Sequence, residues 1–105
     1  MRFVFDIDGV IMTIVESNNY LDAKPIDKTV RIINKLYNLG HEIILFTARG
    51  NKTGIDWEDV TVKQLKDCGL LYHELRFGKP YADYYVDDKF ITLEVIEKQI
   101  IKMGN

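Results

Sequence analysis

Two aspartates, Asp6 and Asp8, stand one residue apart and directly follow an apolar run from Phe3 to Phe5. The run predicts a short buried strand over Arg2 to Phe5, so both carboxyl groups fall at its carboxyl end. Alternation along an extended chain turns Asp6 and Asp8 to the same side, and Gly9 then lets the chain turn away. Like charges this close are costly unless a cation or a reaction uses them, so this segment alone indicates either a functional site or a solvated acidic turn.

Polar groups that could handle phosphate follow three further predicted strands. These strands are predicted over Glu42 to Phe46, Tyr72 to Phe77 and Tyr84 to Val86. The side chains that follow them are Thr47 and Arg49, then Lys79, then Asp87 and Asp88. Because the carboxyl ends of parallel strands face one crevice, we expect these groups to converge with Asp6 and Asp8. Several carboxylates at one point favour Mg²⁺, and a lysine and a threonine beside them could hold the oxygens of a phosphoryl group.

Helical patterns separate the predicted strands. Helices are expected from Asp27 to about Leu39, from the segment that opens at Asp56, and after Thr92. The predicted N-caps are Asp27, Asp56 and Thr92, and Gly40 and Gly69 end the first two helices. Val10 to Lys24, broken at Glu16 to Asn19, predict a hairpin that projects over the first strand end. The alternation of strands and helices predicts an α/β fold, a small Rossmann-like parallel sheet flanked by helices on both faces.

Composition limits the class of protein. The 105 residues predict one domain over 1–105, and 47% of them are hydrophobic, enough for a core. No apolar run approaches the roughly 20 residues that span a bilayer, so we expect no membrane contact. The single cysteine, Cys68, favours a reducing, cytoplasmic setting. A net charge of −2 with scattered basic residues leaves nucleic acid possible only as a bound end.

The four strand-end motifs, taken in order, resemble those of phosphatases of the haloacid-dehalogenase superfamily. The matching segments are Phe-Asp-Ile-Asp-Gly-Val, Leu-Phe-Thr-Ala-Arg-Gly, Gly-Lys-Pro and Val-Asp-Asp-Lys. The likeness extends over essentially the whole chain. It implies that Asp6 is a nucleophile that forms an aspartyl-phosphate, and that Asp8 protonates the leaving oxygen and later deprotonates water. The aspartate two places after the nucleophile resembles the residue found at that position in family members that hydrolyse phosphate esters.

The resemblance also implies roles for the remaining residues. Substrate would be bound by Thr47, Ala48, Arg49 and Lys79, and Lys79 would also pair with Asp6. Mg²⁺ would be held by Asp6, the backbone carbonyl of Asp8 and the fourth-motif acids. Of these acids Asp88 is favoured as the direct ligand, with Asp87 supporting it. For Arg49 the alternative is an ordinary surface arginine beside a strand end.

The short intervals between the motifs leave no room for a separate cap domain. The chain therefore resembles capless members, in particular short capsule-biosynthesis-type and polynucleotide-end-type phosphatases. An open site must exclude water through a large substrate or another subunit, which makes a homo-oligomer plausible. We expect a Mg²⁺-dependent phosphatase acting on a sugar phosphate or similar metabolite. The alternatives are a polynucleotide-end phosphatase, a receiver-like phospho-acceptor domain and a catalytically silent partner subunit.

Overall fold

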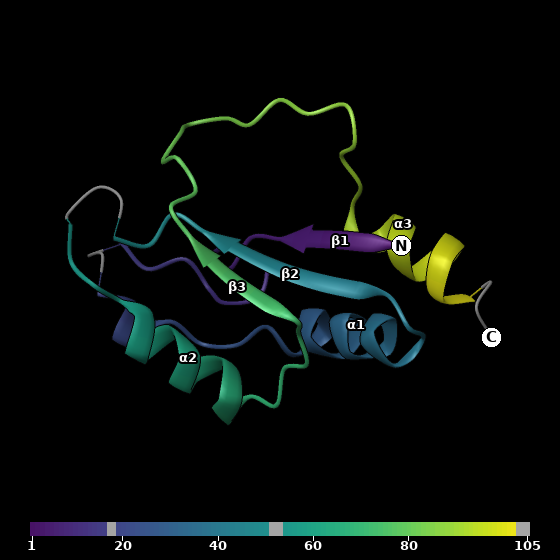
Figure 1. The fold of residues 1–105 in the computed structure, drawn as a ribbon, viewed down its shortest axis with the longest axis horizontal. Helices are drawn as coiled ribbons and strands as arrows, with labels where there is room; N and C mark the ends of the chain where they lie inside the picture. Colours follow the sequence, from purple (N-terminus) through teal and green to yellow (C-terminus); the bar gives the residue numbers. More distant parts are fainter. Residues whose placement is uncertain (17–18, 51–53, 103–105) are drawn as a thin grey trace.

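The sheet of the protein contains three parallel strands, as seen in the computed structural model, which describes residues 1–16, 19–50 and 54–102 (Figure 1). The strand order is β1-β2-β3, so β2 lies at the centre. The strands are β1 (Arg2–Phe5), β2 (Glu42–Thr47) and β3 (Glu74–Phe77). The helical elements are η1 (Tyr20–Asp22), α1 (Asp27–Asn38), α2 (Glu58–Asp67), α3 (Leu93–Val95) and the π-helical η2 (Ile96–Ile101) that continues α3. The α/β fold with a parallel sheet is therefore confirmed.

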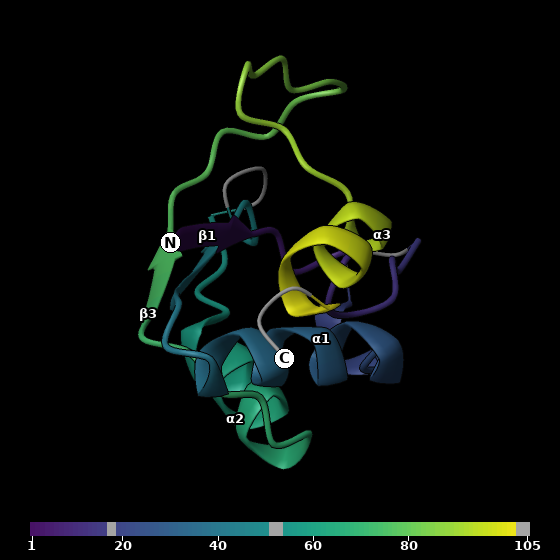
Figure 2. The same ribbon diagram turned by 90° about the vertical axis from the view of Figure 1, so that its right-hand side faces the viewer.

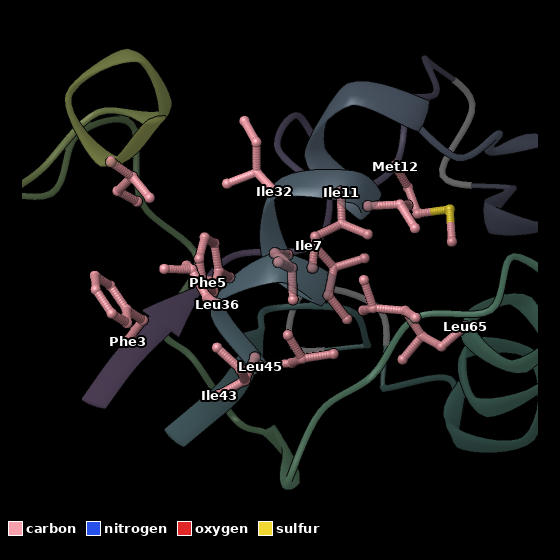
Figure 3. Packing of buried hydrophobic residues seen from close by; sticks show 14 of the residues in the cluster. Phe3, Phe5, Ile7, Ile11, Met12, Ile32, Leu36, Ile43, Leu45 and Leu65 are labelled. Carbon is pink, nitrogen blue, oxygen red and sulfur yellow. The ribbon is translucent and has the colours of Figure 1, made fainter. Parts of the chain in front are cut away.

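The core lies on one face of this sheet. Phe3 pairs with Ile43 and Phe5 with Leu45 in register, and all four side chains are buried on that face (Figure 3). The α1 and α2 helices and the C-terminal helical segment gather on this side in Figure 2, and their apolar residues join the same cluster. On the other face Val4 is 60% exposed. The described helices thus gather mainly on one face of the sheet, whereas we expected helices on both faces.

The ends of α1 follow from local hydrogen bonds. The helix begins at Asp27 with Ile26 as its N-cap, so the prediction that Asp27 caps the helix was wrong by one residue. Asp27 instead contributes its negative charge to the first turn, where the helix dipole favours it. At the other end Gly40 has φ +94°, and its N–H donates to the Tyr37 carbonyl while that of His41 donates to Leu36. This pair of bonds is a Schellman motif, which confirms Gly40 as the end of the helix.

The later helices agree with their predicted caps more closely. Asp56 Oδ1 accepts the Glu58 N–H at 2.9 Å, although Trp57 is the N-cap residue of α2. The helix ends at Asp67, and Gly69, which has φ +73°, follows the C-cap residue Cys68 as expected for a helix end. Thr92 caps α3 as predicted, since its hydroxyl accepts the Val95 N–H. Ile96, in the segment that continues α3, is buried in the core.

The predicted fourth strand over Tyr84 to Val86 was wrong. These residues have no strand partner in the structure, and Val86 is fully exposed. Residues 80–91, between β3 and α3, are exposed and form a loop that arches away from the sheet (Figure 1). Among the described residues, the outer edge of β1 therefore stays unpaired. The strand propensity of Tyr84 to Val86 was not enough to add these residues to the sheet, because a strand is stabilised by the neighbours against which it packs.

The connection from β1 to α1 forms part of the predicted hairpin. Its two legs are joined by the Thr13 N–H, which donates to the Lys24 carbonyl, and by the Ile26 N–H, which donates to the Ile11 carbonyl. Residues 17 and 18, at the predicted break, lie outside the described residues. Within the part of the chain that is described, no helix has the length and apolar character required to cross a bilayer.

Candidate active site

The turn after β1 presents Asp6 and Asp8 at the carboxyl end of the sheet. Asp6 Oδ1 accepts the N–H of Ile7 at 2.8 Å. The Ile7 carbonyl then accepts three successive N–H groups, from Val10, Ile11 and Met12, which tightens the chain into a single turn. Gly9 permits this turn because its φ is +87°, and an added Cβ would lie 3.2 Å from the Ile14 side chain. Asp6 keeps 33% of its side chain exposed and is open to a ligand.

Lys79 reaches Asp6 from the end of β3. Its Nζ lies 3.4 Å from Asp6 Oδ2, and the lysine side chain is only 18% exposed. The backbone fixes this approach, since the Lys79 N–H donates to the Thr47 carbonyl at 3.0 Å. The ammonium group also lies 4.1 Å from the centre of the Tyr85 ring, a cation–π contact. The predicted pairing of Asp6 with Lys79 is therefore present, together with an aromatic neighbour that the sequence did not indicate.

Arg49 contacts Asp8 rather than the solvent. Its side chain is fully inaccessible, and its Nη2 donates to Asp8 Oδ1 at 2.9 Å while Nε donates to Oδ2 at 3.1 Å. This two-pronged pairing is the geometry in which guanidinium and carboxylate bind most strongly. Arg49 was predicted to bind substrate, with an ordinary surface arginine as the alternative. The structure agrees with neither role, because the guanidinium is buried against an acid of the site. Asp8 itself remains 23% exposed.

Further polar side chains of the site come from α2 and the η1 turn. Arg49 Nη1 donates to the hydroxyl of Thr61 at 2.9 Å and to Gln64 Oε1 at 2.7 Å. The Tyr20 ring lies over the guanidinium, 4.6 Å from its carbon, and Trp57 packs edge-on against that ring. Sequence reasoning missed Thr61 and Gln64 as site residues. Their i, i+3 spacing on α2 was the available signal, because such residues share one face of a helix.

Thr47 and Ala48 lie between these groups at the end of β2. Thr47 is fully buried, and its Oγ1 accepts the Arg49 N–H at 3.1 Å. Ala48 is half-buried. Beside them is a depression of about 250 Å³ between the ends of β2 and β3 and the start of α2. Its lining includes Trp57 and Phe77. A substrate at Asp6 would therefore meet Ala48 more readily than the inaccessible Thr47.

Asp87 and Asp88 do not join the site in the described structure. Both are exposed, directly after the residues that were predicted to form a fourth strand. Asp87 Oδ1 accepts the Lys89 N–H, and this bond lowers the pKa of the Asp87 carboxyl. Without a strand at Tyr84 to Val86, nothing carries these acids to the carboxyl end of β1.

The acids at the end of β1 do not by themselves fit Mg²⁺. Asp6 is paired with Lys79 and Asp8 with Arg49, so each negative charge already has a cation. Among residues 1–16, 19–50 and 54–102 there is no group of three acidic, histidine or cysteine side chains that could hold a metal ion. Mg²⁺ typically takes near-octahedral oxygen coordination, which this set does not supply. The predicted four-acid site is therefore not assembled in this structure.

Comparison with known proteins supports the fold. The structure is similar to a crystal structure of a structural-genomics target from Vibrio cholerae, with a TM-score of 0.81 and 21% sequence identity. The match covers 98% of this chain and 92% of the other. No protein-family model and no curated protein matches the chain. At this level of identity the likeness establishes a small α/β domain with a Rossmann-like parallel sheet.

Proposed function

We propose that the chain is a phosphatase that hydrolyses a phosphate monoester through an aspartyl-phosphate on Asp6. The observation that supports this most directly is the 3.4 Å pair between Asp6 and Lys79, which come from the ends of two different strands. A partly exposed carboxylate beside a sheltered ammonium group combines a nucleophile with a charge that can stabilise phosphoryl oxygens. Asp8 lies two residues from the nucleophile, where it can exchange protons with the substrate.

The proposed reaction has two displacements at phosphorus. In the first, which requires that Asp8 has taken a proton from the solvent, an Asp6 oxygen forms a bond to phosphorus, the bond to the ester oxygen breaks, and Asp8 gives that oxygen its proton. In the second, Asp8 takes a proton from water, the water oxygen bonds to phosphorus, and the bond to Asp6 breaks to release phosphate. Lys79 would stabilise the charge on the phosphoryl oxygens in both steps. The two steps restore both aspartates to their starting state.

The proposal includes Mg²⁺ only as a cation that Asp87 or Asp88 would help to bind. Oxygen ligands at Asp6 and the Asp8 backbone carbonyl suit a hard cation, but a third acid would have to come from the exposed segment after β3. Mg²⁺ would supply further neutralisation of phosphate charge when bound. The substrate that we propose is a sugar phosphate or similar small metabolite, because the net charge of −2 does not favour a polyanion.

The test is phosphate release from a panel of esters by the wild-type protein and by Asp6→Asn. The panel contains sugar phosphates, nucleotides and a 3′-phosphorylated oligonucleotide, each assayed with Mg²⁺ and with EDTA. Asp67→Asn is a matched control, since Asp67 lies in an exposed ion pair with Lys63 on α2. We expect release that Asp6→Asn abolishes and Asp67→Asn preserves. No release from any ester would contradict the proposed function, and a stable aspartyl-phosphate would favour a phospho-acceptor domain.

A further inference from the structure

Arg49 is a charged residue placed where it cannot meet a substrate. Its side chain has no accessible surface, although it stands two residues after a strand that ends at the site. Burial of a charge is costly unless the charge is paired and hydrogen-bonded. Arg49 meets this condition with partners from three separate segments of the chain, namely the turn after β1, helix α2 and the η1 turn.

The pairing with Asp8 fixes the orientation of that carboxylate. Both Asp8 oxygens accept bonds from the guanidinium, Oδ1 from Nη2 and Oδ2 from Nε. A planar donor pair that contacts both oxygens restricts rotation of the carboxylate, which a single contact would leave free. An anion that sought Arg49 from the solvent would first have to displace Asp8. The geometry therefore separates Arg49 from the substrate and assigns its charge to Asp8.

Gln64 extends the same contact to the η1 turn. Its Oε1 accepts from Arg49 Nη1 at 2.7 Å, and its Nε2 donates to the Tyr20 carbonyl at 2.6 Å. Because the Tyr20 ring also covers the guanidinium, the η1 turn is held by the Gln64 side chain of α2 and by a cation–π contact with Arg49. Burial raises the pKa of Tyr20, with a further contribution from the nearby Asp8 charge. The η1 turn and the Asp8 carboxylate are thus both in contact with Arg49.

We propose that Arg49 is a positioning residue that fixes the Asp8 carboxylate and, through Gln64, couples its orientation to the docking of the η1 turn on α2. The inference rests on the proposed function, in which Asp8 exchanges protons with the substrate. In this arrangement a movement of the η1 turn away from α2 disturbs the guanidinium that holds Asp8. Proton transfer depends on placement within hydrogen-bond reach, so a loosened carboxylate slows the reaction without weakening phosphate binding.

Two conservative variants probe the two halves of this coupling. Arg49→Lys keeps the charge but removes the paired donors to Asp8. Gln64→Glu keeps an acceptor for Arg49 but removes the donor to the Tyr20 carbonyl. Gln99→Glu is the matched control, because Gln99 is exposed on η2. The kinetic readout is the separation of kcat from KM with the preferred ester.

We expect Arg49→Lys to lower kcat by about 10- to 100-fold with KM nearly unchanged, since a misplacement of about 1 Å can have an effect of this size. Gln64→Glu should lower kcat in the same way but less, and Gln99→Glu should match the wild type. Unchanged kcat with a raised KM in Arg49→Lys would overturn the inference, because it would make Arg49 a substrate-binding residue.

A second readout does not depend on catalysis. Trp57 is the only tryptophan of the chain and packs edge-on against Tyr20 at 5.0 Å, so its fluorescence reports whether the η1 turn is docked. Acrylamide quenching of Trp57 should increase in Gln64→Glu and also in Asp8→Asn, because Asp8 is linked to the η1 turn through Arg49 and Gln64. Quenching unchanged in Asp8→Asn would refute the coupling. If the wild type hydrolyses no ester, the proposed function fails and this measurement still decides the coupling.

Discussion

Arg49 and Arg2 form ion pairs of nearly equal length that differ in burial, which permits a matched stability experiment. Arg49 Nη2 lies 2.9 Å from Asp8 Oδ1, and Arg2 Nε lies 2.8 Å from Glu42 Oε1. The Arg49 side chain is inaccessible, whereas that of Arg2 is 63% exposed. Because solvent screens exposed pairs, we expect Arg49→Met to destabilise the fold strongly and Arg2→Met to leave it nearly unchanged.

The size of the Arg49 effect follows from the groups that lose a partner. Removal of one member of a buried ion pair costs about 3 to 5 kcal/mol. Asp8 is 23% exposed, so water can hydrate part of the unpaired carboxylate and reduce this cost. Thr61 and Gln64 each lose a hydrogen bond from the guanidinium, and these losses overlap within one network. We therefore expect the free energy of unfolding to fall by about 3 kcal/mol in Arg49→Met.

The assay is urea unfolding followed by circular dichroism. A loss of this size should move the midpoint of Arg49→Met down by roughly 1 to 3 M urea at ordinary slopes for a small domain, whereas Arg2→Met should coincide with the wild type. The double variant Asp8→Asn/Arg49→Met should be less destabilised than the sum of the two single variants, because the pair is then removed together. Coincident midpoints for Arg49→Met and Arg2→Met would refute the reasoning, since burial would then have no effect on the pair.

Three further predictions concern other parts of the molecule. Lys79→Met should lower kcat for ester hydrolysis by about 100-fold or more, while Lys63→Met, in an exposed pair, should not. Val86→Ser should leave the urea midpoint unchanged because Val86 is fully exposed. The control Leu45→Ala, in the core, should lower the free energy of unfolding by about 2 to 5 kcal/mol. A clear loss of stability in Val86→Ser would indicate a buried fourth strand. Burial lowers the pKa of His41, so the unfolded chain binds a proton more readily than the folded one. Stability should therefore decrease as pH falls below about 6.5, and His41→Asn should weaken this dependence if midpoints are compared at pH 7.5 and 5.5.

Local patterns in the sequence were sufficient to predict the three strands that form the sheet. Each apolar run that became β1 or β2 is bounded by polar residues or glycine, so its limits could be identified without knowledge of its partners. The glycine that ends α1 was equally accessible, because a positive φ at Gly40 is a local requirement. The convergence of Lys79 with Asp6 followed from the rule that parallel strands end at one edge, and the pairing of the two side chains followed from the family resemblance.

The parts that could not be predicted depend on distant contacts. Tyr84 to Val86 has the residue types of a strand, but whether it pairs depends on an edge that lies more than 70 residues earlier in the chain. The burial of Arg49 likewise depends on Asp8, 41 residues away, and on side chains of α2. An arginine within a strand-end motif favours anion binding when its neighbours are unknown, and only the folded structure identifies the anion as Asp8.

The contact of the proposed nucleophile Asp6 with Lys79 depends on β3, which lies at the edge of the sheet. This strand has only four residues, with exposed and half-buried positions in alternation, while Asp8 and Arg49 are held by the buried network. Edge elements with few buried contacts open in local fluctuations that leave the rest of a protein folded. Such an opening would carry Lys79 away from Asp6 and leave the support of Asp8 intact. The catalytic pair would then be lost on heating before the domain itself unfolds, and hydrogen exchange would be faster at Phe77 than at Leu45.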